Sequence, residues 1–220
     1  MRLNLPSPIL YLITSGKTTS RTTPHSEDFT NILGLIEAAV AAGVSLIQLR
    51  EKNLTARVLT ALTEQAASLT RASNSKLLVN DRADIARAAG ADGVHLTTTS
   101  LPADVVRKTF GADFVIGAST HTLEEAQEAK RSDADFVVFG PVFDTESKRK
   151  FGEPQGVEKL RQIVSVVEPL PVIAIGGVSL DNAIDCFRAG AIGVAAIRLL
   201  QNPNDLNRVT RTLIQQYEQK

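Results

Sequence analysis

The chain has a single cysteine and no excess of either charge. Both features restrict the classes of protein to which it can belong. Its 220 residues include one cysteine, Cys186, so no internal disulfide can form and a reducing compartment is expected. We expect Cys186 to be a small buried residue of a helix. The 24 basic residues balance 24 acidic residues. This balance argues against a general nucleic-acid or membrane surface, so any cationic site must be local.

Long hydrophobic runs are also missing. No apolar run reaches the roughly 20 residues of a membrane-spanning helix, and Met1 to Pro8 lack the apolar core of a signal peptide. We therefore expect a cytoplasmic protein. Hydrophobic residues nevertheless make up 43% of the chain. That content suits one globular domain over residues 1–220, since α/β barrels often form a single unit of about 200–250 residues.

Short apolar runs rich in β-branched residues alternate with amphipathic segments of helical spacing. The expected strands are Ile9–Ile13, Ser45–Leu49, Lys76–Val79, Gly93–Leu96, Phe114–Gly117, Asp135–Phe139, Pro171–Ile175 and Ile192–Ile197. The expected helices are Asp28–Ala42, Thr55–Ala72, Ala83–Ala89, Pro102–Phe110, Leu123–Arg131, Gly156–Val167, Leu180–Ala189 and Pro203–Tyr217. Eight strand–helix pairs in strict alternation predict a TIM (β/α)₈ barrel. An open doubly wound sheet is the alternative, which the lack of Gly-x-Gly-x-x-Gly after the first strand disfavours.

Functional residues of such a barrel lie in the loops after the strands. Gln48, Arg50 and Lys52 follow the second apolar run and would point to one side if the strand continues through them. One amide and two cations at a strand end suit an anion, because arginine and lysine grip phosphate as a planar fork and a point charge. A strand that frays into a charged loop is the alternative.

Polar residues also follow the third and fourth strands. Asn80 and Asp81 offer oxygen ligands that suit Mg²⁺ or a hydroxyl, unless Asp81 instead caps the next helix. His95 lies within the fourth strand, where we expect a hydrogen-bonded core or rim histidine. Ser100 precedes Pro102 and is expected to be the N-cap of the following helix.

After the fifth strand, Ser119 and His121 precede a predicted capping box made by Thr122 and Glu125. A histidine at the mouth of a barrel can act as acid or base near neutral pH. The alternative for His121 is a hydrogen bond to the loop backbone.

The last three strand ends predict anion binding. The long loop after the sixth strand carries Lys148 among three cations. This pattern indicates a lid that closes over a polyanion or, alternatively, a loop whose charges are solvated. Gly176 and Gly177 let the backbone approach an oxyanion after the seventh strand, where this fold usually binds phosphate. Two anion sites are therefore expected, one at the glycines with strand eight and one at Arg50 and Lys52 with Lys148. A monophosphate and a diphosphate substrate would explain both.

Motifs in chain order resemble those of the thiamine-phosphate synthase family, whose superfamily also contains thiazole tautomerase. They are Gln48-Leu49-Arg50-Glu51-Lys52, Asn80-Asp81-Arg82-Ala83-Asp84-Ile85-Ala86, Gly90-Ala91-Asp92-Gly93-Val94-His95-Leu96, Gly140-Pro141-Val142-Phe143 with Thr145 and Lys148, and Ile175-Gly176-Gly177 with Asn182. The resemblance covers nearly the whole chain. It implies a transferase that joins a pyrimidine-methyl diphosphate to a thiazole phosphate, releases pyrophosphate and uses Mg²⁺.

The resemblance also implies residue roles. The diphosphate would be held by cations and amides, the pyrimidine would lie beside Gln48, Mg²⁺ would be carried by Asp81, and the thiazole phosphate would meet the backbone of Gly177. The expected catalytic residues are Arg50, Ser119, His121 and Lys148. The expected substrate contacts are Gln48, Arg50, Lys52, Asn80, Ser119, Thr145, Ser147, Lys148, Gly176, Gly177, Ile197 and Arg198, and the expected metal ligands are Asp81 and Ser100.

Two positions depart from the family's pattern. Ser100 stands where the family has its second metal carboxylate, and Arg198 stands where it has a phosphate-binding serine. These departures keep open a thiazole tautomerase with His121 as acid and base, or a barrel that binds phosphate without catalysis. A tautomerase would have no need for Gln48, Lys52 and the pair Asn80-Asp81 together. The expected partners are small phosphorylated substrates; the sequence allows a homodimer without fixing the oligomeric state.

Overall fold

The fold is a closed barrel of eight parallel strands in chain order, described for residues 5–145 and 153–220 of a computed structural model. The strands are β1 (Ile9–Ile13), β2 (Leu46–Leu49), β3 (Lys76–Asn80), β4 (Gly93–Leu96), β5 (Val115–Thr120), β6 (Phe136–Phe139), β7 (Val172–Ile175) and β8 (Gly193–Ala196). Strand β1 pairs with β8 and closes the ring. The predicted TIM barrel is confirmed, and the open doubly wound sheet is wrong.

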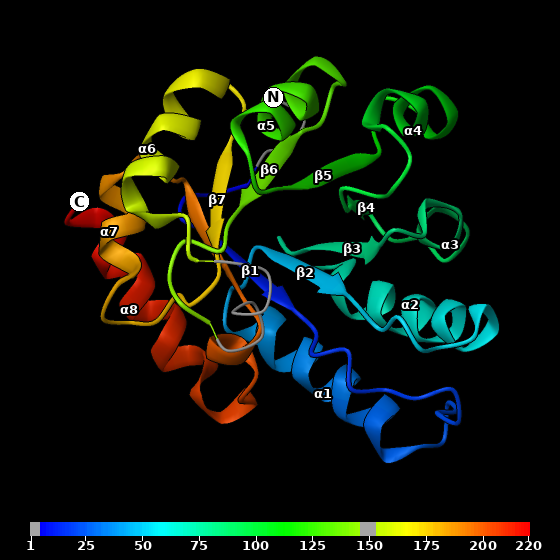
Figure 1. The fold of residues 1–220 in the computed structure, drawn as a ribbon. Coiled ribbons are helices and arrows are strands. Elements are labelled where there is room, and N and C mark those ends of the chain that lie inside the picture. The colour runs from blue at the N-terminus through cyan, green and yellow to red at the C-terminus, as the bar shows by residue number, and fades with distance from the viewer. Residues whose placement is uncertain (1–4, 146–152) are drawn as a thin grey trace.

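Helices surround the strands on the outside (Figure 1). They are α1 (Glu27–Ala41), α2 (Ala56–Thr70), α3 (Ala83–Ala88), α4 (Ala103–Phe110), α5 (Leu123–Arg131), α6 (Gly156–Val167), α7 (Ala183–Arg188) and α8 (Leu206–Glu218), with short 3₁₀ turns η2 (Arg198–Leu200) and η3 (Pro203–Asp205) before α8. The free thiol of Cys186 is buried in α7, as predicted. Within the described residues, no helix combines the length and apolar character that a membrane span needs.

Apolar side chains fill the inside of the barrel below its mouth. Tyr11, Leu46, Leu78 and Phe136 belong to this interior cluster. Gly117 makes room for the Phe136 ring, since a Cβ at Gly117 would lie 2.3 Å from Phe136 Cζ. Because side chains alternate along a strand, the inward positions above this cluster lie at the carboxyl ends of the strands. Inward-facing side chains at the strand ends therefore line the mouth of the barrel.

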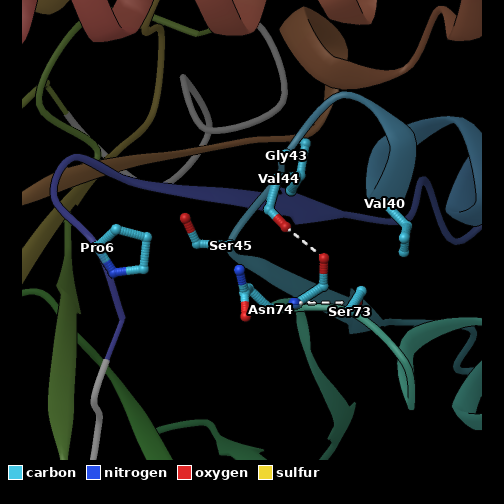
Figure 2. Close-up of a pocket in the computed structure, with 8 residues that line it drawn as sticks. Pro6, Val40, Gly43, Val44, Ser45, Ser73 and Asn74 are labelled. Carbon is cyan, nitrogen blue, oxygen red and sulfur yellow. Dashed lines mark hydrogen bonds between the residues drawn. The ribbon is translucent and has the colours of Figure 1, made fainter.

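A separate cavity of about 270 Å³ lies near the amino ends of β1, β2 and β3, away from the mouth. Figure 2 shows Pro6, Ser45 and Asn74 around it. Its lining residues are uncharged, and Ser75 Oγ donates to the carbonyl of Val44 at 2.7 Å. The amino face of this fold usually serves stability, and the contacts here tie neighbouring loops together.

Candidate active site

Gln48 and Asn80 form a polar pair at the ends of neighbouring strands β2 and β3. Gln48 is 1% exposed, and its Nε2 donates to Asn80 Oδ1 at 3.1 Å. Gln48 Oε1 is buried and has no hydrogen-bond partner among the described residues. A buried acceptor left without a donor is costly, so a ligand N–H group at this position would stabilise the site.

Arg50 follows β2 directly, and the loop after β1 is fastened beside it. The Arg50 N–H donates to Thr14 Oγ1 at 2.9 Å. Glu51 is buried, and its carboxylate accepts from the Gly16 N–H at 3.1 Å and from Thr18 Oγ1 at 2.7 Å. Glu51 is a positioning residue that sequence reasoning missed, although a carboxylate between two cations was a visible signal.

Of the two readings left open for Gln48 to Lys52, the structure contains the strand that ends and continues as a charged loop. The strand ends at Leu49, and Lys52 is exposed in a turn. Strand alternation therefore does not bring Lys52 to the side of Gln48, because the chain turns away to begin α2. No hydrogen bond or ion pair involves Lys52 within the part of the chain that the structure describes.

Asp81 and Ser100 meet at the mouth, one from the end of β3 and one from the loop after β4. The Ser100 hydroxyl donates to Asp81 Oδ1. The backbone of Asp81 is left-handed, with φ of 64°, and its N–H donates to the carbonyl of His95 at 2.9 Å. The hydrogen bond holds this turn against β4, α3 begins two residues later at Ala83, and Asp81 is exposed.

Two capping expectations are wrong at these positions. The N-cap of α4 is Pro102, while Ser100 Oγ accepts from the Thr97 N–H at 2.7 Å. The N-cap of α3 is Arg82, whose own side chain makes no capping hydrogen bond. Both side chains are thus drawn into the loops at the mouth, where they bond to each other instead of to helix ends.

The oxygen ligands at Asp81 are too few for an all-protein metal cage. Among the described residues, no group of three or more histidine, cysteine or carboxylate side chains could hold a metal ion. One carboxylate and one hydroxyl nevertheless fit the way Mg²⁺ is usually bound, because it keeps several waters and takes its other ligands from substrate phosphates.

A row of hydrogen bonds joins Tyr11 of β1, His95 of β4 and Ser119 of β5. Tyr11 OH lies 3.2 Å from His95 Nδ1, and His95 Nε2 lies 2.8 Å from Ser119 Oγ. Burial lowers the pKa of His95 to about 3, so the imidazole is neutral. The expectation of a hydrogen-bonded core histidine is confirmed. Tyr11 was missed, although it is a lone hydroxyl in an apolar strand.

His121 lies just beyond β5 and is held by two backbone contacts. Its Nδ1 donates to the carbonyl of Gly140 at 2.5 Å, and its N–H donates to Glu125 Oε2. The predicted capping box of Thr122 and Glu125 is confirmed. Of the two roles expected for His121, the structure contains the backbone hydrogen bond, while a role as acid or base stays a prediction.

The paired glycines after β7 lie directly against the loop after β6. Gly176 and Gly177 have φ of 94° and 66°. A Cβ on Gly177 would lie 2.5 Å from the carbonyl oxygen of Asp144. Asn182 closes the turn, since its Nδ2 donates to the Gly177 carbonyl at 3.0 Å and its Oδ1 accepts from the Ser179 N–H at 2.8 Å. Only glycine fits this close, left-handed path.

Arg198 connects the end of β8 to the loop after β6. Its Nη2 donates to Thr145 Oγ1 at 3.0 Å, and the guanidinium belongs to an exposed residue. Ile197 packs partly buried against the barrel interior. The loops after β7 and β8 thus each contact the loop after β6, and the monophosphate site expected at the glycines with strand eight stays a prediction. Ser147 and Lys148 fall within residues 146–152, outside the described residues, and their contacts with substrate stay predictions.

Comparison with known proteins agrees with this geometry. A model of the family described as thiamine monophosphate synthase matches residues 10–200. The thiamine-phosphate synthase of Roseiflexus castenholzii is 42% identical over 183 residues, which cover 83% of this chain and 80% of that protein. The thiamine-phosphate synthase of Chlorobium luteolum is 36% identical over 213 residues, 96% of this chain and 94% of that protein.

Solved structures give the same result. The thiamine phosphate pyrophosphorylase of Pyrococcus furiosus matches with a TM-score of 0.78 and 32% identity, covering 96% of both chains. The 3-hexulose-6-phosphate synthase of Salmonella typhimurium, with a TM-score of 0.67 and 13% identity over 96% of this chain and 99% of that one, shares the fold alone. The predicted resemblance is confirmed, and the chain belongs to the thiamine monophosphate synthase family.

Proposed function

We propose that this chain is a thiamine-phosphate synthase that couples hydroxymethylpyrimidine diphosphate with a thiazole phosphate and releases pyrophosphate. The family match and the relatives support this transferase activity. The observation that carries the proposal at the site is Gln48 Oε1, which is buried and has no hydrogen-bond partner in the described part of the chain. An aminopyrimidine offers the N–H donor that this acceptor needs, and a thiazole phosphate alone offers none there.

The two phosphorylated groups would bind on opposite sides of the mouth. Arg50 and Ser119 would hold the diphosphate, with Lys148 closing over it from the loop after β6. The backbone of Gly177 would hold the monophosphate. Arg198, which replaces the serine of the family's pattern, would add a side-chain cation there, and its hydrogen bond to Thr145 supports that placement.

The chemistry needs one bond to break and one to form. The C–O bond between the pyrimidine methylene and the diphosphate breaks, and the electron pair leaves with pyrophosphate. The lone pair of the thiazole nitrogen then forms a C–N bond to the pyrimidine-methyl cation. No protein nucleophile takes part, so this chain would act by binding, aligning the two rings and stabilising the leaving group with fixed cations.

We also propose that Asp81, with Ser100 beside it, holds Mg²⁺ together with the substrate diphosphate. Bound Mg²⁺ would supply positive charge to the leaving group. Asp81→Asn keeps the left-handed backbone at low cost, because asparagine tolerates that conformation. We expect this variant to need more Mg²⁺ for half-maximal rate, and Ser100→Asp to need less, because it restores a second carboxylate.

The test is to incubate the purified protein with both phosphorylated precursors, with and without Mg²⁺, and to measure thiamine phosphate. Product is expected only with Mg²⁺, and Arg50→Ala or Lys148→Ala should abolish it. Arg161→Ala is the matched control, because Arg161 is an exposed residue of α6 paired with Glu158. Full activity in excess chelator, or isomerisation of the thiazole phosphate without coupling, would contradict the proposal.

The proposed activity implies that the partners of this chain are small phosphorylated substrates. A cytoplasmic location is supported by the buried, unpaired Cys186, which suits a reducing compartment.

A further inference from the structure

The row Tyr11–His95–Ser119 has a direction that can be read from its hydrogen-bond partners. Tyr11 is 0% exposed, and within the described residues its hydroxyl has one hydrogen-bond partner, His95 Nδ1. A phenol carries one hydrogen and an unprotonated ring nitrogen is an acceptor. If Nδ1 carried the proton, the Tyr11 hydrogen would be buried without an acceptor. The Tyr11 O–H therefore donates to Nδ1.

The tautomer of His95 follows from that first bond. A neutral imidazole carries one proton, so with Nδ1 as acceptor the proton lies on Nε2. Nε2–H then donates to Ser119 Oγ, at 2.8 Å. Burial keeps both groups in this state, since it lowers the pKa of His95 to about 3 and raises the pKa of Tyr11 well above its ordinary value.

The Ser119 hydroxyl is the end of the row. Its oxygen accepts from His95, and no other hydrogen bond of this hydroxyl occurs among the described residues. Its own hydrogen is thus left to point toward the mouth, where Ser119 is half-buried. Phosphate oxygens accept hydrogen bonds and do not donate them when ionised. A serine whose hydrogen is free suits them, whereas one whose hydrogen is spent on histidine does not.

Ring packing holds this geometry in place. The Tyr11 and His95 rings lie edge to face with centroids 5.8 Å apart, and Phe136 lies 5.9 Å from Tyr11 and 6.2 Å from His95. The imidazole plane cannot turn without displacing these rings.

We propose that Tyr11 and His95 are positioning residues which fix the Ser119 hydroxyl as a hydrogen-bond donor to the leaving diphosphate. The inference rests on the proposed function for the identity of the anion. The direction of the row rests on the protein alone. His95 does not transfer a proton in this scheme; it acts through Ser119.

The first test reads the tautomer in the wild-type protein. The chain has 3 histidines, so ¹⁵N-histidine labelling gives few signals, and those of His95 are identified by their loss in His95→Gln. We expect a protonated Nε2 and an unprotonated Nδ1 in His95, unchanged from pH 5 to pH 9. A proton on Nδ1, or titration near neutral pH, would overturn the proposal.

The second test measures binding of inorganic pyrophosphate, with Mg²⁺ present, to a set of variants. Ser119→Ala should weaken binding about tenfold, the effect of losing one hydrogen bond to an anion. Tyr11→Phe, which is nearly isosteric, should weaken it severalfold in the wild-type background and not at all in Ser119→Ala. His95→Gln should retain more affinity than His95→Leu, because glutamine keeps a donor.

Tyr217→Phe on α8 is the matched control and should bind pyrophosphate as the wild type does. Equal losses from Tyr11→Phe with and without Ser119 would overturn the proposal, because a merely structural role predicts them. If the effect of Tyr11→Phe on pyrophosphate binding depends on Ser119, but the protein forms no thiamine phosphate, the inference is supported and the proposed function is contradicted.

Discussion

At the scale of the residue, burial decides which polar groups at the barrel can change charge. His95 is 3% exposed and neutral. Burial, with Asp185 nearby, raises the pKa of the Cys186 thiol to about 12, so this cysteine is inert at neutral pH. Asp81 and Arg198 are exposed at the mouth, so the contacts proposed for them with metal and substrate do not depend on burial. The proposed chemistry thus relies on fixed charges and fixed dipoles.

The buried His95 should make the free energy of unfolding depend on pH. Its pKa falls from 6.5 to about 3 on folding, so the unfolded chain binds the extra proton first. The free energy of unfolding should therefore fall as pH drops below 6.5, by about 1.4 kcal/mol per pH unit from this group. From pH 7 to pH 5 the loss should be about 2 kcal/mol.

Urea denaturation of the wild type and His95→Gln at both pH values checks this. The glutamine variant should show a smaller pH dependence, by that amount. His25→Gln, at an exposed position before α1, is the matched histidine-to-glutamine control. Equal pH dependence in wild type and His95→Gln would contradict the assignment.

At the scale of the element, local spacing predicted the strands and helices, and tertiary contacts moved some of their ends. Strand β5 was expected to end at Gly117 but runs to Thr120, because Ser119 and Thr120 pair with Val138 and Phe139 of β6. Helix α7 was expected from Leu180 but begins at Ala183, because the Asn182 side chain closes a turn before it. Both shifts affect residues at the mouth.

The turn after β7 provides an element-scale prediction. Gly177→Ala should cost stability because of its left-handed backbone, by about 1 kcal/mol. It should also weaken thiazole phosphate binding about tenfold or more, because the new Cβ pushes the turn away from Asp144 and the phosphate loses a backbone donor. Calorimetric titration of the variant with thiazole phosphate measures this loss.

Gly43→Ala is the matched control. Gly43 has φ of 76°, and a Cβ at this position would have no heavy-atom contact within 4 Å. It lies before β2, at the opposite end of the barrel. It should show the same backbone strain with unchanged phosphate affinity. If both variants bind thiazole phosphate normally, the Gly177 turn does not form the phosphate site.

At the scale of the whole molecule, closure of the barrel brings the strand ends to one mouth. The seam between β1 and β8 depends on Gly193, which pairs with Ile9. A Cβ on Gly193 would lie 2.1 Å from the Ile9 carbonyl oxygen. The seam has no room for a side chain at this position.

Gly193→Ala should therefore lower the free energy of unfolding by about 1–3 kcal/mol, the usual cost of overpacking. Gly34→Ala in α1 is the control: nothing lies within 4 Å of its Cβ, and alanine should stabilise the helix by about 0.5–1 kcal/mol. Denaturant unfolding compares the two. If Gly193→Ala is as stable as Gly34→Ala, the seam is not tightly packed.

The amino-acid sequence by itself determined the alternation of strands and helices, the barrel, and the residue types at each strand end. These follow from hydrophobic periodicity and turn chemistry, which act between residues close in the chain. It also identified Gln48, Asp81 and Gly177 as site candidates, because polar or flexible residues directly after apolar strands stand out locally.

Tertiary structure alone decided which of these groups meet. Tyr11 reaches His95 across 84 positions, and Arg198 reaches Thr145 across 53. Glu51 stands between two cations in the sequence, but its contact with the loop after β1 depends on the tertiary placement of that loop. Contacts of this kind depend on the tilt and closure of the whole barrel, which no local pattern in the chain encodes.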